Sequence, residues 1–178
     1  MIMNNWFECK VRTEKMLEGG ATKKVTEPYL VDALNFTEAE ARITEEISPF
    51  CNGQLEVVDI KRARYCEMFT SELESADKWY KVKLQFIIID EKSGKEKLSA
   101  VNYLVQSNTL QNAVKNVEEV MDTGMQDWKL ASVAETTLMD VFEHDGTKHV
   151  NKVVKDDRPE YEDAMNAELQ AGAENVEA

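Results

Sequence analysis

Residues that build metal and catalytic centres are scarce in this sequence. Its 178 residues include three cysteines and two histidines. Cys9, Cys51 and Cys66 are scattered without a CxxC pair, which indicates a reducing compartment and structural roles for the thiols. His144 and His149 lie in the turn HDGTKH, and two ligands in one loop fall short of the three or four that a metal ion needs. We therefore expect neither a metal site nor a cofactor.

Motifs of catalysis and of membrane insertion are missing as well. No serine lies in a GxSxG elbow, and no glycine-rich phosphate loop is present. Adjacent carboxylates such as Glu45 and Glu46 are typical of an exposed helix surface. An enzyme is therefore the least favoured class of function. No apolar run reaches the length of a membrane span, and the N-terminus lacks the features of a signal peptide, so we expect a cytoplasmic protein that does not enter membranes.

The composition is that of an ordinary globular protein with a strong excess of acid. Hydrophobic residues make up 43% and charged residues 31% of the chain, and the net charge is −13. The length fits one domain or two small ones. The negative charge argues against a generally basic nucleic-acid coat protein, although it does not exclude a local basic face.

An internal repeat organises the sequence. Three pairs of segments recur at nearly the same spacing, which lies outside the usual solenoid periods and so indicates a duplicated small domain. The pairs are Tyr29-Leu30-Val31 with Tyr103-Leu104-Val105 (offset 74), Trp6-Phe7 with Trp79-Tyr80 (offset 73), and residues 60–69 with 133–142 (offset 73).

Each copy has the pattern strand, strand, helix, strand, because period-2 alternation flanks an amphipathic segment with a threonine at its start. The predicted elements of the first copy are strands over 6–16, 23–34 and 55–69, with a turn at Gly19-Gly20 and a helix from the Thr37 cap to residue 47. Those of the second are strands from Trp79 to the turn at 90–97, over 98–106 and over 128–142, with a helix that Thr109 caps and Gly124 ends.

We therefore expect an α+β fold of two tandem strand-strand-helix-strand units, the first over 1–70 and the second over 71–150. Each sheet should be antiparallel and covered by its helix on one face. The two units would then meet face to face or side by side in one continuous sheet.

The last 28 residues differ in composition. Residues 151–178 contain three basic residues against eight acidic ones, with few core-forming groups, which predicts a mostly disordered acidic tail. Such a tail would recruit a protein or compete for a basic face. A solubilising tail without a partner is the alternative.

One surface pattern points to a ligand. Aromatic side chains beside cations on an open sheet are what single-stranded nucleic-acid binders use, since they stack bases and neutralise phosphates. Exposed lysines can instead discourage edge aggregation, and the tryptophans can instead cap the core or the contact between units. The candidate nucleic-acid-binding residues are Trp6, Lys10, Arg12, Lys61, Arg62, Arg64, Tyr65, Trp79, Lys81 and Lys83.

Five segments carry a family resemblance: WFECKVRTEK, KKVTEPYLVDALNFTEAEARI, VVDIKRARY, KWYKVKLQFIIIDEKSG and ASVAETTLMDVF. Through them, residues 5–145 resemble an uncharacterised domain-of-unknown-function family of Bacteroidetes bacteria and their phages. The resemblance brings no activity and no catalytic residue. It implies a bacterial cytoplasm or a phage-infected cell, in a setting of mobile elements or DNA metabolism.

Two function classes follow. The first is a non-enzymatic module that binds single-stranded nucleic acid, with the acidic tail as a protein-recruiting or autoinhibitory segment. The alternative is a protein-interaction adaptor or a phage-encoded inhibitor of a host protein. The sequence leaves the oligomeric state open.

Overall fold

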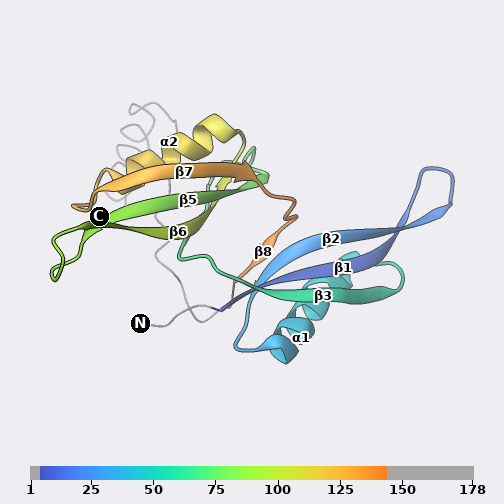
Figure 1. The fold of residues 1–178 in the computed structure, drawn as a ribbon. Helices are drawn as coiled ribbons and strands as arrows, with labels where there is room; N and C mark the ends of the chain where they lie inside the picture. The colour runs from blue at the N-terminus through green and yellow to red at the C-terminus, as the bar shows by residue number, and fades with distance from the viewer. Residues whose placement is uncertain (1–4, 144–178) are drawn as a thin grey trace, which may run out of the picture.

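The fold is α+β, with two mostly antiparallel sheets that each carry one helix (Figure 1). It is known from a computed structural model, which describes residues 5–143. The first half contains β1 (Trp6–Met16), β2 (Thr22–Asp32), α1 (Phe36–Ile47), the 3-10 turn η1 (Ser48–Phe50), β3 (Leu55–Ala63) and β4 (Met68–Phe69). The second half contains β5 (Lys78–Ile89), β6 (Glu96–Ser107), α2 (Leu110–Met121), β7 (Trp128–Glu135) and β8 (Val141–Phe142).

Two long hairpins form the centre of the sheets, as the alternation of the sequence predicted. Phe7, Cys9 and Val11 of β1 are fully buried beneath α1, whereas the residues between them lie on the other face. Gly19 and Gly20 close the β1–β2 hairpin with φ angles of 110° and 84°, which residues with a side chain rarely adopt. Equivalent packing of β5 and β6 beneath α2 forms the second core.

The helix caps correct one prediction and confirm another. Thr109 caps α2, since its side chain accepts a hydrogen bond from the Asn112 amide at 3.2 Å. In α1, however, the cap is Asn35 and not Thr37: the Asn35 side chain accepts from the Glu38 amide at 2.9 Å. Asparagine is at least as good a cap as threonine, so the helix begins at the earlier residue. Neither helix found in residues 5–143 is long and apolar enough to cross a membrane.

The two sheets exchange their last strands. The first sheet has the order β3-β1-β2-β8 and the second β4-β6-β5-β7, and both exchanged strands pair in parallel. The strands predicted over 55–69 and 128–142 are thus each broken, and their final residues cross to the other sheet. The predicted division at residue 70 falls between β4 and β5, but it does not separate the sheets. Side-by-side packing in one continuous sheet is not what forms.

Matching hydrogen bonds hold the two exchanged strands. On the first sheet, the Leu30 amide donates to Asp140 at 3.0 Å and the Met139 amide donates to Pro28 at 2.9 Å. On the second sheet, the Leu104 amide donates to Glu67 at 3.1 Å and the Cys66 amide donates to Asn102 at 2.8 Å. Each partner is 73 or 74 residues from its counterpart, so the spacing of the sequence repeat recurs in the structure.

The repeated Tyr-Leu-Val segment has one role for each of its side chains. The valines, Val31 and Val105, belong to the two helix-sheet cores. The tyrosines stack on the phenylalanines of the exchanged strands, with ring centroids 6.0 Å apart for Tyr29–Phe142 and 5.5 Å for Phe69–Tyr103. The leucines pack between the two sheets in what we call the interface cluster. Its members are Trp6, Leu30, Met68, Trp79, Leu104 and Leu138.

Truncation of the interface cluster should destabilise the whole fold. Leu30 is fully buried, so Leu30→Ala leaves a cavity between the sheets and should lower the free energy of unfolding by about 2–5 kcal/mol. Leu34 is 76% exposed, and Leu34→Ala is a matched control that should cost less than about 0.5 kcal/mol. Urea unfolding measures both variants, and equal losses would contradict this account of the interface.

The stacked tyrosines should make the fold sensitive to alkali. Burial raises the pKa of Tyr29 from 10.0 to about 12, and the Glu27 carboxylate, which accepts its hydroxyl hydrogen bond at 3.1 Å, adds to the rise. Burial also raises the pKa of Tyr103. Above pH 10 the unfolded chain loses these protons while the fold keeps them. The contribution of the two tyrosines to the free energy of unfolding is therefore complete below pH 10, and it falls as pH rises towards 12.

We expect the double variant Tyr29→Phe/Tyr103→Phe to lose less stability than wild type over this pH range. Urea unfolding on both sides of pH 10 measures the difference. A decline as steep as that of wild type would assign the alkaline sensitivity to other groups.

Candidate nucleic-acid interface

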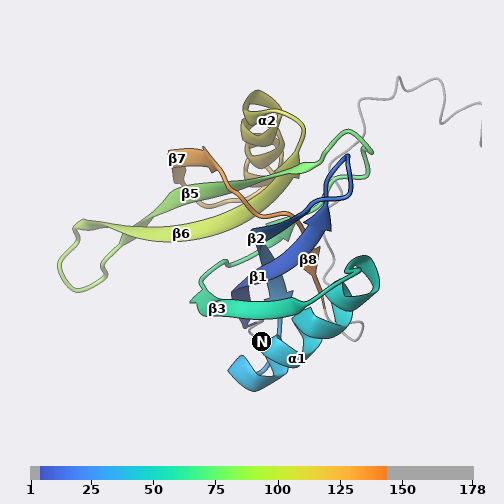
Figure 2. The ribbon, with the colours of Figure 1, turned by 90° about the vertical axis from the view of Figure 1, so that its right-hand side faces the viewer.

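Each sheet has an open face, which we define as the side that carries no helix. The two open faces meet at the interface cluster, and the β1–β2 and β5–β6 hairpins extend from it in opposite directions (Figures 1 and 2). The candidate residues of the two units therefore lie on two separate surfaces and do not form one continuous face.

Three aromatic candidates are packed in the interface. Trp6 and Trp79 are only 3% and 5% exposed, which corrects the prediction that both lie on an exposed surface. They are buried because the open faces press together where the strands are exchanged. Tyr65 packs against the same cluster, and burial raises the pKa of its hydroxyl, with Glu8 as the second cause. Base stacking on any of the three would require the interface to open.

Arg62, near the end of β3, does not lie on the open face of the first sheet. Arg62 pairs with Phe7 on the helix side, where its guanidinium lies 5.6 Å from the centre of the Phe7 ring. Arg64 follows β3 and is exposed. Arg62 therefore makes a cation–π contact within the first unit, and its placement among outward cations is corrected.

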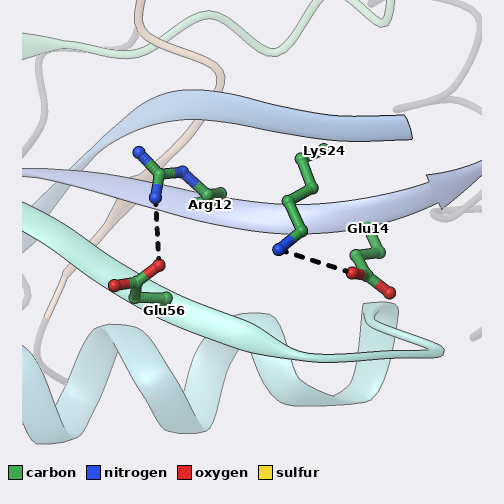
Figure 3. A network of polar contacts seen from close by, with 4 residues as sticks. All are labelled: Arg12, Glu14, Lys24 and Glu56. Carbon is green, nitrogen blue, oxygen red and sulfur yellow. Dashed lines mark hydrogen bonds and ion pairs between the residues drawn. The ribbon is translucent and has the colours of Figure 1, made fainter. Parts of the chain in front are cut away.

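Opposite charges balance the open face of the first sheet. Arg12 lies 3.1 Å from Glu56 and Lys24 lies 3.9 Å from Glu14 (Figure 3). Lys61 lies 3.5 Å from Asp59 on the same face. Of the candidates on this face, Lys10 makes no ion pair with any residue in the described part of the chain. Polyanions would therefore gain little from this surface.

The open face of the second sheet is different. Lys81 and Lys83 of β5 and Lys129 of β7 are exposed, and none forms an ion pair within residues 5–143. The cross-strand pairs place Ala134 and Ser132 beside the first two lysines and Gln85 beside the third. Glu96, at the far end of β6, is the single acidic residue among the described strand residues of this face.

The two open faces differ in charge at equivalent positions of the repeat. At the offset of 73, every acid on the open face of β1 and β3 is replaced by lysine or by an uncharged residue. Glu8, Glu14, Glu56 and Asp59 correspond to Lys81, Ile87, Lys129 and Ser132. A protein with a net charge of −13 thus carries a local face of three lysines, Lys81, Lys83 and Lys129, that form no ion pair within residues 5–143. We call it the lysine face.

Lys129 is a residue that the sequence interpretation missed. The alternation Trp128-Lys129-Leu130 places it opposite Gln85 on the open face, whereas Trp128 packs into the core. That short alternation was the available signal. It was hard to use because a bulge, at the position equivalent to one in β3, shifts the register of β7 directly after Leu130.

Burial disfavours a reactive thiolate at both Cys9 and Cys66. Burial raises the pKa of the Cys9 thiol to about 12. Partial burial also raises the pKa of Cys66, although that residue is exposed and has basic neighbours in sequence. No group of three or more metal-ligating side chains occurs in the part of the chain that the structure describes. His144, His149 and the acidic segment 151–178 lie outside that part.

Comparison with known proteins identifies the family of this chain. Residues 5–144 match the family described as Domain of unknown function (DUF4494). No curated protein and no solved structure matches the chain. The expected membership of an uncharacterised family is confirmed, whereas a source in Bacteroidetes or their phages stays a prediction. Because the match covers most of the 178 residues, the chain belongs to the DUF4494 family.

Proposed function

We propose that the protein is a non-enzymatic binding module that takes single-stranded nucleic acid on the open face of its second sheet. The observation that carries the proposal is the replacement of all four acids of the first sheet's β1 and β3 face by Lys81, Lys129 and uncharged residues. Unpaired lysines on a flat face bind a chain of phosphates by releasing its counterions.

Apolar side chains continue the same face beyond the lysines. Ile87, Ile89 and Leu98 share it, and Ile89 and Leu98 are 68% and 51% exposed. They offer flat contact for bases but lack the stacking of an aromatic ring. Since Trp6 and Trp79 are buried, we expect affinity to depend chiefly on charge and to discriminate little among base sequences.

Three further parts of the proposal concern the rest of the chain. The two halves arose by internal duplication, which accounts for equivalent strands, bulges and exchanged strands at an offset of 73 or 74. The tail over 151–178 recruits a protein or competes for the lysine face. The protein works in the cytoplasm of a bacterium or of a phage-infected cell.

A protein-interaction adaptor, or an inhibitor of a host protein, is the second candidate. The exposed apolar side chains of the β5–β6 hairpin favour it, because side chains of this kind on a strand commonly mark a protein interface. Binding to such a partner need not weaken strongly with salt, which separates the two candidates.

Removal of the lysines should abolish the salt-dependent affinity. With three phosphate contacts, the logarithm of the binding constant should fall with the logarithm of salt at a slope of about −2. We expect Lys81→Ala/Lys83→Ala/Lys129→Ala to bind a fluorescent single-stranded oligonucleotide at least about tenfold more weakly at low salt, with a slope near zero. Fluorescence anisotropy at low and moderate salt measures both.

The matched control removes three lysines from the first sheet. Lys10→Ala/Lys24→Ala/Lys61→Ala changes the net charge by the same amount, and we expect less than about a twofold change in affinity. Equal weakening in the two variants would mean that overall charge, and not the lysine face, binds the ligand. Absence of binding by the wild-type protein at low salt would refute the nucleic-acid proposal.

Shortening the chain should tighten binding if the tail competes for the lysines. A chain that ends at residue 150 lacks three basic and eight acidic residues, so its net charge is less negative by five. We expect this shorter chain to bind the oligonucleotide more tightly. The slope of its binding constant against salt should lie nearer to the value of about −2 expected for three phosphate contacts, and the same anisotropy titration measures it. Unchanged affinity would assign the tail a role elsewhere.

A further inference from the structure

The outer edge of β6 is open beyond the exchanged strand. β4 covers this edge only at Leu104 and Val105, while β6 continues back to Glu96. Two backbone groups of β6 point to this side. The Leu104 amide donates a hydrogen bond to the Glu67 carbonyl, and the Asn102 carbonyl accepts one from the Cys66 amide. Because strand backbone groups alternate in direction, the N–H and C=O groups of Leu98 and Ala100 point to the same open side.

The equivalent edge of the first sheet is blocked against strand addition. Pro28, which has no N–H, occupies the position equivalent to Asn102, and Lys24 occupies the position of Leu98. Proline and lysine on an edge strand are two of the devices by which proteins prevent unwanted pairing. The β6 edge has neither device between residues 98 and 102, and its side chains there are uncharged.

We infer that this edge binds the same edge of a second copy of the chain, antiparallel, about a two-fold axis near Leu98. Such a contact is self-complementary, as a two-fold interface requires. It would continue the sheet from the point where β4 ends. With Glu96, Leu98 and Ala100 paired to the second copy, about six backbone hydrogen bonds form.

Apolar contact and local charge both favour a second copy as the occupant. Ile89 and Leu98 lie together on the open face of this hairpin, which projects away from the body of the molecule (Figures 1 and 2). The charges of the hairpin tip sum to zero, so the tip of each copy can lie beside β6 of the other copy although each chain carries −13. The tip contains Asp90, Glu91 and Glu96 against Lys92, Lys95 and Lys97.

Pairing in this way would give the dimer one enlarged lysine face. Directly opposite residues of paired strands project to the same side, and Leu98 and Ala100 of both copies belong to the open face. The second copy therefore contributes its own Lys81, Lys83 and Lys129 to the same surface. This consequence for ligand binding depends on the proposed function, whereas dimerisation does not.

Light scattering and sedimentation of the full chain without nucleic acid test the dimer. We expect a mass that rises with concentration to twice that of one chain. Ala100→Pro removes an outward N–H, and Leu98→Lys places two like charges directly opposite each other at the two-fold axis. Each should weaken association at least about tenfold. The matched control Thr26→Pro makes the first change at the equivalent position of the first sheet and should dimerise like wild type.

Hydrogen exchange of the unmodified protein gives a second measurement that needs no variant. The amides of Leu98 and Ala100 should exchange more slowly as concentration rises, while those of Lys24 and Thr26 should not change. A mass of one chain at every concentration would overturn the inference, as would equal loss of association in the control variant. A dimer that binds no oligonucleotide would refute the proposed function and leave the β6 contact standing.

Discussion

The exchange of β4 and β8 is the constraint on which the rest of the structure depends. Each exchanged strand has only two residues, so it cannot be stable by itself. It is held because it closes the interface cluster, in which Trp6 and Trp79 are buried between the sheets. The same contact directs the two hairpins away from each other and divides the open surface into two faces.

The interior of the two units is similar, whereas their surfaces differ. Tyr, Leu and Val recur at both exchange sites because each side chain fills a required place in a core, an interface or a ring stack. No such requirement acts on the open faces. There the first sheet has balanced ion pairs and an edge interrupted by Pro28. The second sheet has lysines that pair with no acid in the described part of the chain, and its edge is uninterrupted between residues 98 and 102. A ligand with negative charge would therefore favour the second sheet.

Much of the fold could be predicted because it depends on local patterns. The alternation in β1 and β5, the glycine turn and the Thr109 cap each act over a few residues, and the structure contains all of them. The strand exchange could not be predicted in this way. Residues 64–67 interrupt a segment that is otherwise rich in strand-forming residues. Which sheet β4 joins depends on its pairing with β6, which is distant in the sequence. The burial of Trp6 and Trp79 could not be predicted for the same reason, since alternation tells on which face of a strand a tryptophan lies but not whether another unit covers that face.

The most direct test of the account is to map where a ligand touches the protein. A single-stranded oligonucleotide titrated into isotope-labelled full-length protein should shift the amide resonances around Lys81, Lys83 and Lys129 at low salt. The resonances around Arg12 and Lys61 should stay in place, because those cations are already paired. Shifts centred on the first sheet, or shifts spread evenly over both sheets, would contradict a ligand site on the second.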